Sequence, residues 1–405
     1  MKINLSIKLL LIIAFVGFFG HLLPLPLKSG LYALSLSLKE ILLTVLPLII
    51  FSCLMNGMLI HQKKAFIFVL ALFALVCCSN FFSTTIAYVL GDTILPLLKL
   101  KVHFVKDTHL ALPALWSLDF STYKIPNEWA LIAGFLAGTF FSLIHFAPAV
   151  RFNRIAQKGV TTFLEKGFVP LLPIFMLGFL LKMQHDGILM QIIQKYLPLM
   201  GLLALVNILY LSFLFLIVAR FRVKQCIQLI KNILPAGIMG FSTMSSMAAL
   251  PVNISVTEHQ GERQDVIRAV LPTTVNIHLV GDSIGIPLMA LALLSTFGHS
   301  MPTPEVFFLF STFFVLYKFS VAAVPGGGII VMLPILQQYL GFDSQMSSII
   351  TALYYLFDPL FTATNVMGNS AFALLMSRIF HYIADFKHRS RSRKADLRKT
   401  RPTRA

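Results

Sequence analysis

The sequence predicts an all-α polytopic membrane protein with eight transmembrane helices and two opposed re-entrant helical hairpins. Its mean hydropathy is +0.82, and of its 405 residues 57% are hydrophobic and 12% are charged. This composition is typical of a chain that lies largely in a bilayer and not of a soluble enzyme. Two apolar segments are interrupted by a Ser-rich run or by a Gly- and Pro-rich run. Since hydrocarbon cannot satisfy the backbone groups that such runs free, they must be buried in protein or face a watery cavity.

Eight apolar stretches reach the roughly 20 residues that a helix needs to cross the hydrocarbon core. In chain order they are 5–27, 36–60, 65–91, 129–150, 163–184, 197–219, 264–297 and 345–384. The first stretch starts like a signal peptide, but no small-residue cleavage site follows His21, so we expect a retained first helix. We expect the hairpins at 226–253 and 304–340, on either side of the 264–297 helix, which is the layout of an inverted repeat.

The net charge of +17 is concentrated in short loops and in the C-terminal tail. With a cytoplasmic N-terminus, these residues fall on the cytoplasmic side, as the positive-inside rule requires. They are Lys63, Lys64, Arg151, Arg154, Lys158, Arg220, Arg222, Lys224 and the basic residues of 387–404. We therefore expect both termini in the cytoplasm, a basic tail at 386–405 and no nucleic-acid partner. A compact chain without a eukaryotic targeting signal also leads us to expect an inner-membrane protein in the lipid bilayer.

Four polar motifs interrupt the apolar segments of the C-terminal half in a fixed order. They are Phe241-Ser-Thr-Met-Ser-Ser-Met-Ala-Ala-Leu-Pro-Val252, Leu271-Pro-Thr-Thr-Val-Asn-Ile-His-Leu-Val-Gly-Asp282, Val324-Pro-Gly-Gly-Gly328 and Asp358-Pro-Leu-Phe-Thr-Ala-Thr-Asn-Val-Met-Gly-Asn369. In this order the chain resembles the dicarboxylate/amino acid:cation symporter family, which includes glutamate/aspartate and neutral amino acid transporters. By this resemblance the motifs correspond to the first hairpin tip, the seventh-helix signature, the second hairpin tip and the binding stretch of the eighth helix.

The resemblance also implies an architecture and an activity. It implies a secondary active transporter that couples amino acid symport to a cation by alternating access, built as a homotrimer. Residues 1–225 would form mainly the scaffold and trimer contacts, with the third helix contributing to the transport unit. Residues 226–385 would form the moving transport core. No enzymatic activity and no cofactor other than the coupling ion, sodium and/or a proton, are implied.

The two hairpin tips offer a site for a carboxylate. Ser and Gly residues at a tip supply hydroxyls, free N–H groups and the positive ends of helix dipoles. The tip residues are Ser245, Ser246, Val324, Pro325, Gly326 and Gly327. We expect them to bind the α-carboxylate of an amino acid. The alternative is that Ser245 and Ser246 only bond within a tightly packed helix pair, which is a common use of small polar residues in membranes.

Asp358 is the strongest single candidate for substrate binding, because a carboxylate at membrane depth is costly and by default functional. Thr362 and Asn365 follow four and seven residues later, so the three side chains share one helical face. In the family that the chain resembles, the matching Asp receives the substrate's amino group. The alternative is a structural Asp358 neutralised by Lys318 or by a histidine.

The chain departs from acidic amino acid transporters at the position that pairs the side-chain carboxylate. Those transporters place an Arg one position before the matching Thr, where this chain has Phe361, and the alternative Arg position at the first tip is Met244. Leaving a second carboxylate unpaired in a low-dielectric pocket would cost several kcal/mol. We therefore expect a neutral side chain contacting Phe361, with an acidic amino acid or dicarboxylate as the alternative if Lys318 reaches the site.

The cation-coupling residues are altered as well. The resemblance implies hydroxyl ligands at Ser83 and Thr84 and places His278, Val280 and Asn369 where the family has Asn, Asp and Asp. The candidate coupling residues are Ser83, Thr84, Thr274, Asn276, His278, Asp282, Asn365 and Asn369, with a sodium site expected at Ser83, Thr84, Asn365 and Asn369. His278 and Asp282 are four residues apart and could hydrogen-bond as a proton relay, or each could be satisfied by other neighbours. Proton coupling, fewer sodium ions and exchange without net coupling stay open.

Other function classes fit the sequence less well. A channel would need a selectivity filter or a charged ring, and none is evident. A membrane enzyme would need a nucleophile and base or a metal constellation, and no HExxH, GxSxG or phosphate loop occurs. A coupling-defective exchanger or a sensor with the same fold is the remaining alternative.

Overall fold

The described part of the chain is largely α-helical. The computed structural model describes residues 5–59, 66–98, 112–118, 120, 125–144, 146–187, 189–321 and 326–399, and none of these residues lies in a β-strand. The helices of the N-terminal half are α1 (Leu5–Phe19), α2 (Leu25–Leu59), α3 (Phe66–Ile94), α4 (Asn127–Leu143), α5 (Ala147–Thr162), α6 (Val169–His185) and α7 (Leu189–Val218). Those of the C-terminal half are α8 (Val223–Thr243), α9 (Ser246–Glu258), α10 (Gln264–Thr274), α11 (Val280–Thr296), α12 (Pro304–Tyr317), α13 (Gly327–Leu340) and α14 (Ser344–Lys399).

The helix boundaries differ from the expected apolar stretches in several places. The second helix begins at Leu25 instead of residue 36, and the basic segment around Arg151 forms helix α5 and not a loop. A π-helical turn, Phe163–Phe168, joins α5 to α6. Hydropathy alone misses these extensions because a helix continues past the apolar stretch wherever its backbone hydrogen bonds can be made.

The expected single helix at 264–297 is two helices. α10 ends at Thr274 and α11 begins at Val280, so residues 275–279 form a break inside the apolar segment. Breaks of this kind place backbone N–H and C=O groups where ions and ligands bind in transporters.

Both predicted hairpin segments form pairs of helices that pack on each other. In the first, Met244 adopts a left-handed conformation with φ of +53°, and Ser245 caps α9 by accepting the Ala248 N–H at 3.3 Å. In the second, α12 continues into a 3-10 turn, Lys318–Ser320, and Gly326 precedes α13 with φ of +76°. A glycine suits this position because a side chain there would be strained. Whether either pair re-enters the membrane from one side stays a prediction.

Three helical stretches are long and apolar enough to cross a membrane by themselves within the described residues. They are Leu25–Ser52, Leu72–Leu98 and Pro198–Val218. Four shorter apolar stretches, Leu11–Leu22, Trp129–Leu143, Val280–Thr296 and Gly327–Leu340, accompany them. The apolar helices indicate a membrane protein, and the number of complete spans stays a prediction.

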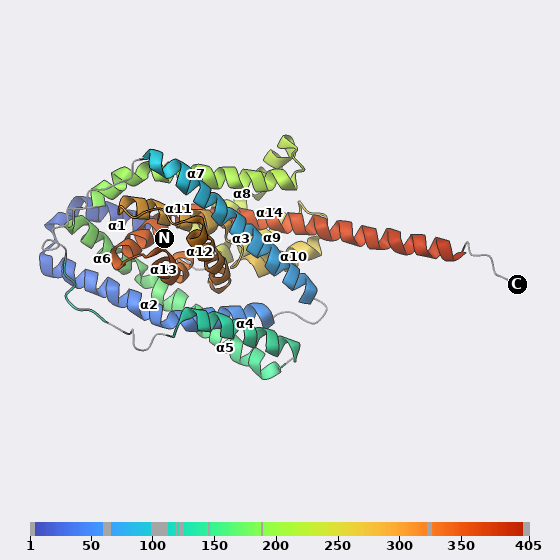
Figure 1. Ribbon diagram of the computed structural model, residues 1–405, viewed down its shortest axis with the longest axis horizontal. Coiled ribbons are helices and arrows are strands. Elements are labelled where there is room, and N and C mark those ends of the chain that lie inside the picture. The colour runs from blue at the N-terminus through green and yellow to red at the C-terminus, as the bar shows by residue number, and fades with distance from the viewer. Residues whose placement is uncertain are drawn as a thin grey trace.

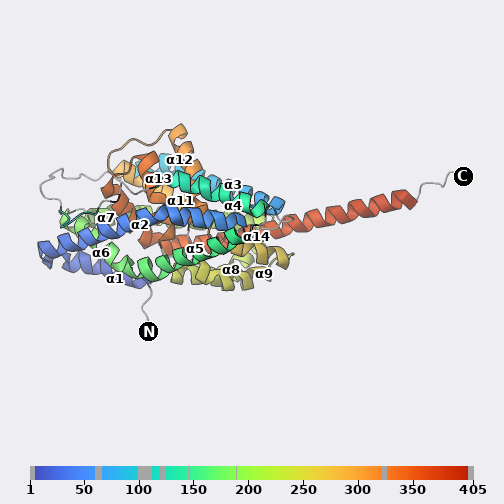
Figure 2. The same ribbon diagram turned by 90° about the horizontal axis from the view of Figure 1, so that it is seen from below.

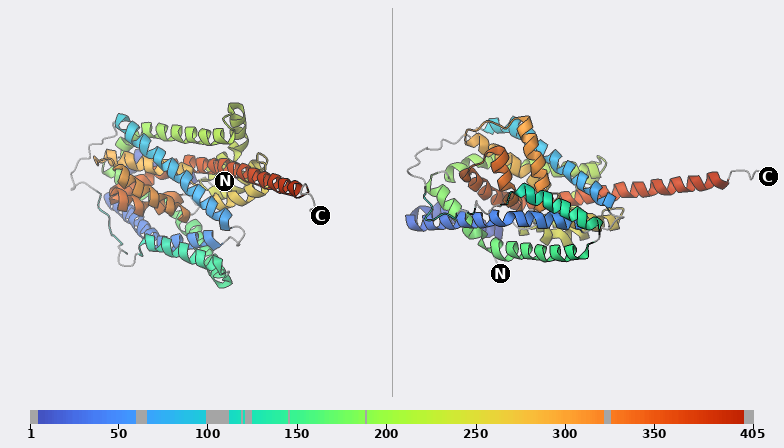
Figure 3. Two further views of the ribbon diagram at one scale, coloured as in Figure 1. Left: turned by 45° about the vertical axis from the view of Figure 1, so that its right-hand side comes forward. Right: turned by 60° about the horizontal axis from the view of Figure 1, so that its bottom comes forward.

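The helices pack as two groups. α2 packs against α4, α5 and α6, and α1 packs against α6. α14 packs against α7, α8, α9, α10 and α11, and α3 packs against α11 and α12. In Figure 1 the orange to red helices α11, α13 and α14 lie between α2 below and α7 above, and Figure 2 shows α14 continuing beyond the bundle. Figure 3 shows the red helix α14 leaving the bundle from two further sides.

This packing bears on the expected domain boundary at residue 225. Both α3 and α7 precede that boundary, yet both contact the C-terminal helices. Of the helices before this boundary, the sequence analysis assigns only the third to the C-terminal unit. The contacts of α7 with α8, α11 and α14 suggest that α7 belongs with that unit as well. The division into scaffold and transport unit itself stays a prediction.

Helices α2 and α6 cross closely at Gly178, and this contact yields a stability prediction. A Cβ at Gly178 would lie 2.7 Å from the Leu31 carbonyl carbon, and backbone cannot move aside as a side chain can. Ser35 also donates across the crossing to the Ile174 carbonyl at 3.3 Å. We expect Gly178→Ala to destabilise the protein by about 1–3 kcal/mol through overpacking, measured as a lower melting temperature in detergent.

The control for this variant is Gly201→Ala in α7. A Cβ at Gly201 meets no atom within 4 Å, so only the helix propensity changes. We expect Gly201→Ala to melt at or above the temperature of the unaltered protein. Equal melting of the Gly178 variant and the unaltered protein would mean that the two helices can separate without cost.

Candidate functional site

A small cavity lies where both hairpins, the start of α11 and the middle of α14 meet. Its volume is about 20 Å³. The residues that line it are Met244, Ser246, Leu279, Asp282, Val321, Gly328, Tyr354, Asp358, Thr362 and Asn365. Of the tip and α14 residues that the sequence singles out for the substrate, Ser246, Asp358, Thr362 and Asn365 are among them. The structure therefore brings together polar groups that are more than 100 residues apart in the chain.

Asp358 is buried, with 3% of its surface exposed, and both of its carboxylate oxygens are hydrogen-bonded. Oδ2 accepts the backbone N–H of Gly326 at 2.8 Å, and Oδ1 accepts the Thr362 hydroxyl at 2.8 Å. The carboxylate thus joins the second hairpin tip to α14. A charged group held by two donors still has free lone pairs for a ligand cation.

Asn365 connects α14 to the start of α11. Its Nδ2 donates to Asp282 Oδ1 at 3.2 Å, and its Oδ1 accepts the Gly281 N–H at 2.8 Å. The Tyr354 hydroxyl also donates to Asp282 Oδ1, at 3.2 Å. Asp282 therefore lines the cavity as a second carboxylate, whose orientation is fixed by two donors from α14.

The first hairpin tip contributes a hydroxyl and the beginning of a helix. Ser246 is the first residue of α9, where backbone N–H groups have no partner within the helix. Such a helix N-terminus favours an anion. Ser245 caps the helix and does not line the cavity, whereas Met244 does.

Some of the predicted substrate residues lie elsewhere. Val324 and Pro325 fall outside the described residues, and Gly327 is buried at the start of α13. Phe361 is fully buried and does not line the cavity. Its ring packs 5.7 Å from that of Tyr354 and fills the space left by Gly285 of α11. A direct contact between Phe361 and the substrate therefore finds no support in this geometry.

Of the two alternatives for His278 and Asp282, the structure agrees with the second, in which each side chain is satisfied by other neighbours. The His278 ring pairs with the Ser79 hydroxyl at 2.9 Å and with Asn369 Oδ1 at 3.2 Å, and it packs against Phe372 with a centroid distance of 4.5 Å. His278 lies in the break before α11, so the spacing of four residues does not place it on one helical face with Asp282.

Of the other predicted coupling residues, Ser83, Thr84 and Thr274 are buried and bond within their own helices. Ser83 and Thr84 donate to the Asn80 carbonyl of their own helix, at 3.0 and 2.8 Å, and Thr274 likewise donates to Val270 at 3.0 Å. Asn276 Oδ1 is buried without a hydrogen-bond partner among the described residues. No group of three or more His, Cys, Asp or Glu side chains that could hold a metal ion occurs in the described part of the chain.

Asn80 of α3 is the main site-forming residue that the sequence analysis misses. Its Nδ2 donates to the Ile277 carbonyl at 2.7 Å, and its Oδ1 accepts the Leu279 N–H at 3.2 Å and the Ser283 hydroxyl at 3.3 Å. One amide thus satisfies both sides of the helix break. The sequence could have identified Asn80, because a polar Asn inside an apolar membrane segment itself indicates a functional or structural role.

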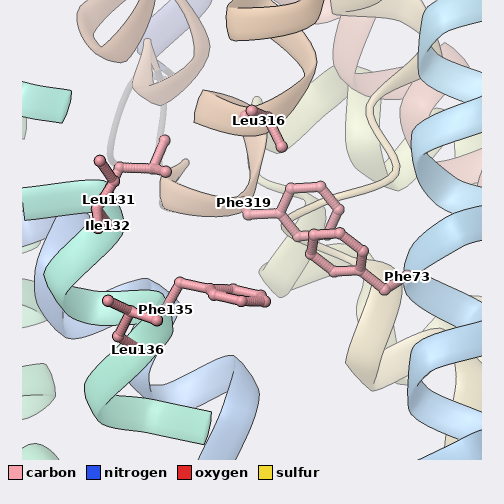
Figure 4. Close-up of a pocket in the computed structure, with 7 residues that line it drawn as sticks. All are labelled: Phe73, Leu131, Ile132, Phe135, Leu136, Leu316 and Phe319. Carbon is pink, nitrogen blue, oxygen red and sulfur yellow. The ribbon is translucent and has the colours of Figure 1, made fainter.

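A larger, apolar cavity of about 230 Å³ lies between α4 and the end of the α12 segment (Figure 4). Its lining is Phe73, Leu131, Ile132, Phe135, Leu136, Leu316 and Phe319. The rings of Phe73 and Phe319 stack on each other at one side of it, with a centroid distance of 4.1 Å. An amino acid zwitterion would find no polar partner there, and burying its charges unpaired is costly, so this cavity is not a candidate substrate site.

The chain is similar in sequence to known transporters. The model of the "Sodium:dicarboxylate symporter family" matches residues 5–379. The chain is 28% identical over 189 residues to the proton/sodium-glutamate symport protein of Geobacillus stearothermophilus, a match that covers 46% of this chain and 44% of that relative. It is 23% identical over 394 residues to the serine/threonine transporter SstT of Streptococcus agalactiae, covering 92% of this chain and 94% of the relative.

Proposed function

We propose that this chain, which belongs to the sodium:dicarboxylate symporter family, is a secondary active transporter that carries an amino acid with a neutral side chain. Members of that family are transporters and not enzymes. The observation that supports the proposal most strongly is the buried Asp358 carboxylate, which faces a cavity between two helix pairs. In this reading Asp358 binds the substrate ammonium.

The other cavity residues complete a site for a zwitterion. Ser246 and the N-terminus of α9 supply the donors for the substrate carboxylate. Thr362 lies beside Asp358 and can exchange its intramolecular hydrogen bond for one to the ligand. The α9 N-terminus would therefore bind the substrate carboxylate, and Asp358 with Thr362 would bind the ammonium. Neither end needs a buried Arg.

The size of the cavity implies a conformational change. About 20 Å³ of space holds roughly one water molecule. An amino acid needs more room, so a hairpin must move outward before the substrate can bind. The Gly326 N–H is held by Asp358, so we propose that the substrate ammonium and the second hairpin tip compete for this carboxylate and that their exchange is part of alternating access.

The lining also supports a neutral side chain. Two carboxylates, Asp282 and Asp358, line the cavity, and no Lys, Arg or His is among its described lining residues. A second carboxylate on the substrate would meet negative charge and no cation. The relative named for serine and threonine transport agrees with this expectation, whereas the relatives named for glutamate symport match over less than half of their length.

Three further properties are also proposed: the coupling ion, the assembly and the membrane orientation. We propose that sodium, a proton or both drive uptake, that the protein is an inner-membrane homotrimer, and that both termini face the cytoplasm. Residues 226–385 with α3 and α7 would move as the transport unit against a scaffold of α1, α2, α4, α5 and α6. The grouping of helix contacts supports this division.

Ligand-induced stabilisation of the purified protein tests the substrate class. A neutral amino acid such as serine, threonine or alanine at about 100 times its Kd should stabilise the protein by about 2.7 kcal/mol. We expect a matching rise in melting temperature with at least one neutral amino acid. We expect no rise with aspartate or glutamate.

Uptake into proteoliposomes under an imposed sodium or proton gradient then tests transport. Competition by neutral but not acidic amino acids agrees with the proposal. Tight aspartate binding would instead support the acidic alternative. Binding without accumulation under either gradient would favour an exchanger or sensor of the same fold.

A further inference from the structure

Lys318 is a fully buried lysine, with 0% of its surface exposed, in the turn that ends the first half of the second hairpin. Its ammonium donates to the Leu279 carbonyl at 2.7 Å and lies 4.9 Å from the centre of the Phe314 ring. It also attracts the Asp282 carboxylate electrostatically. The side chain therefore places a positive charge between the second hairpin and the start of α11.

The acceptor of this ammonium is the carbonyl oxygen of Leu279, which precedes α11. The Leu279 oxygen already accepts the Ser283 N–H at 2.9 Å and the Ser283 hydroxyl at 2.9 Å. It is the last carbonyl of the helix break, one turn before Asp282. Leu279 and Asp282 line the same cavity, and carbonyl and carboxylate oxygens are the ligands that hard cations such as sodium prefer.

Burying a lysine ammonium in this position costs free energy unless neighbouring groups compensate its charge. Here the ammonium bonds to the Leu279 carbonyl at 2.7 Å, lies over the Phe314 ring and interacts with Asp282 at longer range. The described lining of the substrate cavity includes Leu279 and Asp282 but not Lys318. The ammonium therefore does not line the cavity, and we do not expect it to contact the substrate.

We propose that the Lys318 ammonium is a tethered cation that takes the place of a sodium ion at the junction of the second hairpin with the α10–α11 break. The inference rests on the proposed transport function and deepens it. Because the charge belongs to the hairpin, it closes the hairpin onto α11 without a bound ion. The carrier then needs one sodium ion fewer than it would with an apolar residue at this position.

The test replaces the tethered cation and asks whether sodium takes its place. Lys318→Met keeps much of the side-chain volume but removes the charge. The Leu279 carbonyl then loses its ammonium donor, and Asp282 loses a nearby positive charge. We expect the melting temperature of this variant to rise with sodium chloride, relative to the same concentration of choline chloride, by more than that of the unaltered protein. Lys318→Arg, which keeps a cation, should respond to sodium as the unaltered protein does.

A matched control comes from a second lysine near a carboxylate. Lys182 of α6 pairs with Asp186 at 2.7 Å, and its side chain is 15% exposed. Lys182→Met removes a charge from an ion pair away from the site. Its sodium response should equal that of the unaltered protein, which separates a local site from a general effect of lost charge.

Two further measurements keep the proposal testable if Lys318→Met folds poorly. The yield of folded Lys318→Met protein should recover when sodium is present during extraction. The double variant Lys318→Met/Asp282→Asn should lose the added sodium response, because the carboxylate that attracts the ion is gone. An equal sodium response in Lys318→Met and the unaltered protein would overturn the tethered-cation proposal.

Uptake provides an independent comparison. Amino acid uptake by Lys318→Met should gain a sodium dependence of about tenfold, equivalent to about 1.4 kcal/mol, beyond that of the unaltered protein. The melting experiments contain no substrate. A failure of the proposed transport function would therefore abolish uptake by every variant and leave the difference in sodium response intact.

Discussion

Asp358→Asn is expected to weaken amino acid binding by on the order of 30-fold or more and to abolish accumulation in proteoliposomes. In a site closed off from water, the substrate ammonium would lose its charged partner, at a cost of about 2–5 kcal/mol. At about 1.4 kcal/mol for each factor of ten, the lower limit corresponds to roughly 30-fold. The Asn side chain can still accept the Gly326 N–H or the Thr362 hydroxyl, so we expect the fold to persist.

Isothermal titration with the neutral amino acid found by melting measures this loss directly. Asp186→Asn is the matched control, because Asp186 is a partly buried carboxylate that pairs with Lys182 outside the cavity. Its affinity should equal that of the unaltered protein. Normal binding by Asp358→Asn would show that Asp358 is a structural partner of the second hairpin tip and that the α14 face is not the substrate site.

The α14 side of this site follows from local spacing. Asp358, Thr362 and Asn365 are four and three residues apart, which places them on one helical face, and all three line the cavity. Their role in binding stays a prediction. Positions 0, 4 and 7 of a helix are related by backbone geometry alone, so one sequence suffices to predict their common direction.

Phe361 illustrates what spacing cannot predict. It lies three residues after Asp358 and could share its face, yet its ring packs against α11, where Gly285 leaves room for it. That space depends on a glycine 76 residues away in the sequence. The fate of Phe361 is therefore set by a tertiary contact, which no local pattern contains.

The helix break has a similar origin. The stretch from 264 to 297 is apolar enough to read as one helix, and Thr, Asn and His residues in its middle are compatible with a helix interior. The break forms where α3 supplies Asn80 to satisfy the released backbone groups. Because His278 then lies outside α11, it does not share a helical face with Asp282, and the alternative of a direct bond between the two is not formed.

Asn80→Leu is consequently expected to be the most damaging change away from the cavity lining. It leaves the Ile277 carbonyl and the Leu279 N–H without their side-chain partner inside the protein. Each buried backbone group without a partner costs about 1–3 kcal/mol. We expect a lower melting temperature and the loss of uptake, since Leu279 and Asp282 both line the cavity.

Asn207→Leu in α7 is the control that separates this effect from the simple loss of a buried amide. Asn207 is also fully buried, but its Nδ2 donates only to the Leu203 carbonyl of its own helix, at 2.8 Å, within the described contacts. The Leu203 carbonyl lies one helical turn earlier, within a continuous helix. Losing the side-chain bond to it should therefore change the melting temperature little. If Asn80→Leu melts and transports like Asn207→Leu, the break at 275–279 holds its shape without Asn80. The backbone groups of the break must then bond to water or to the coupling ion. In the second case residues 275–279 themselves would bind the ion that drives uptake.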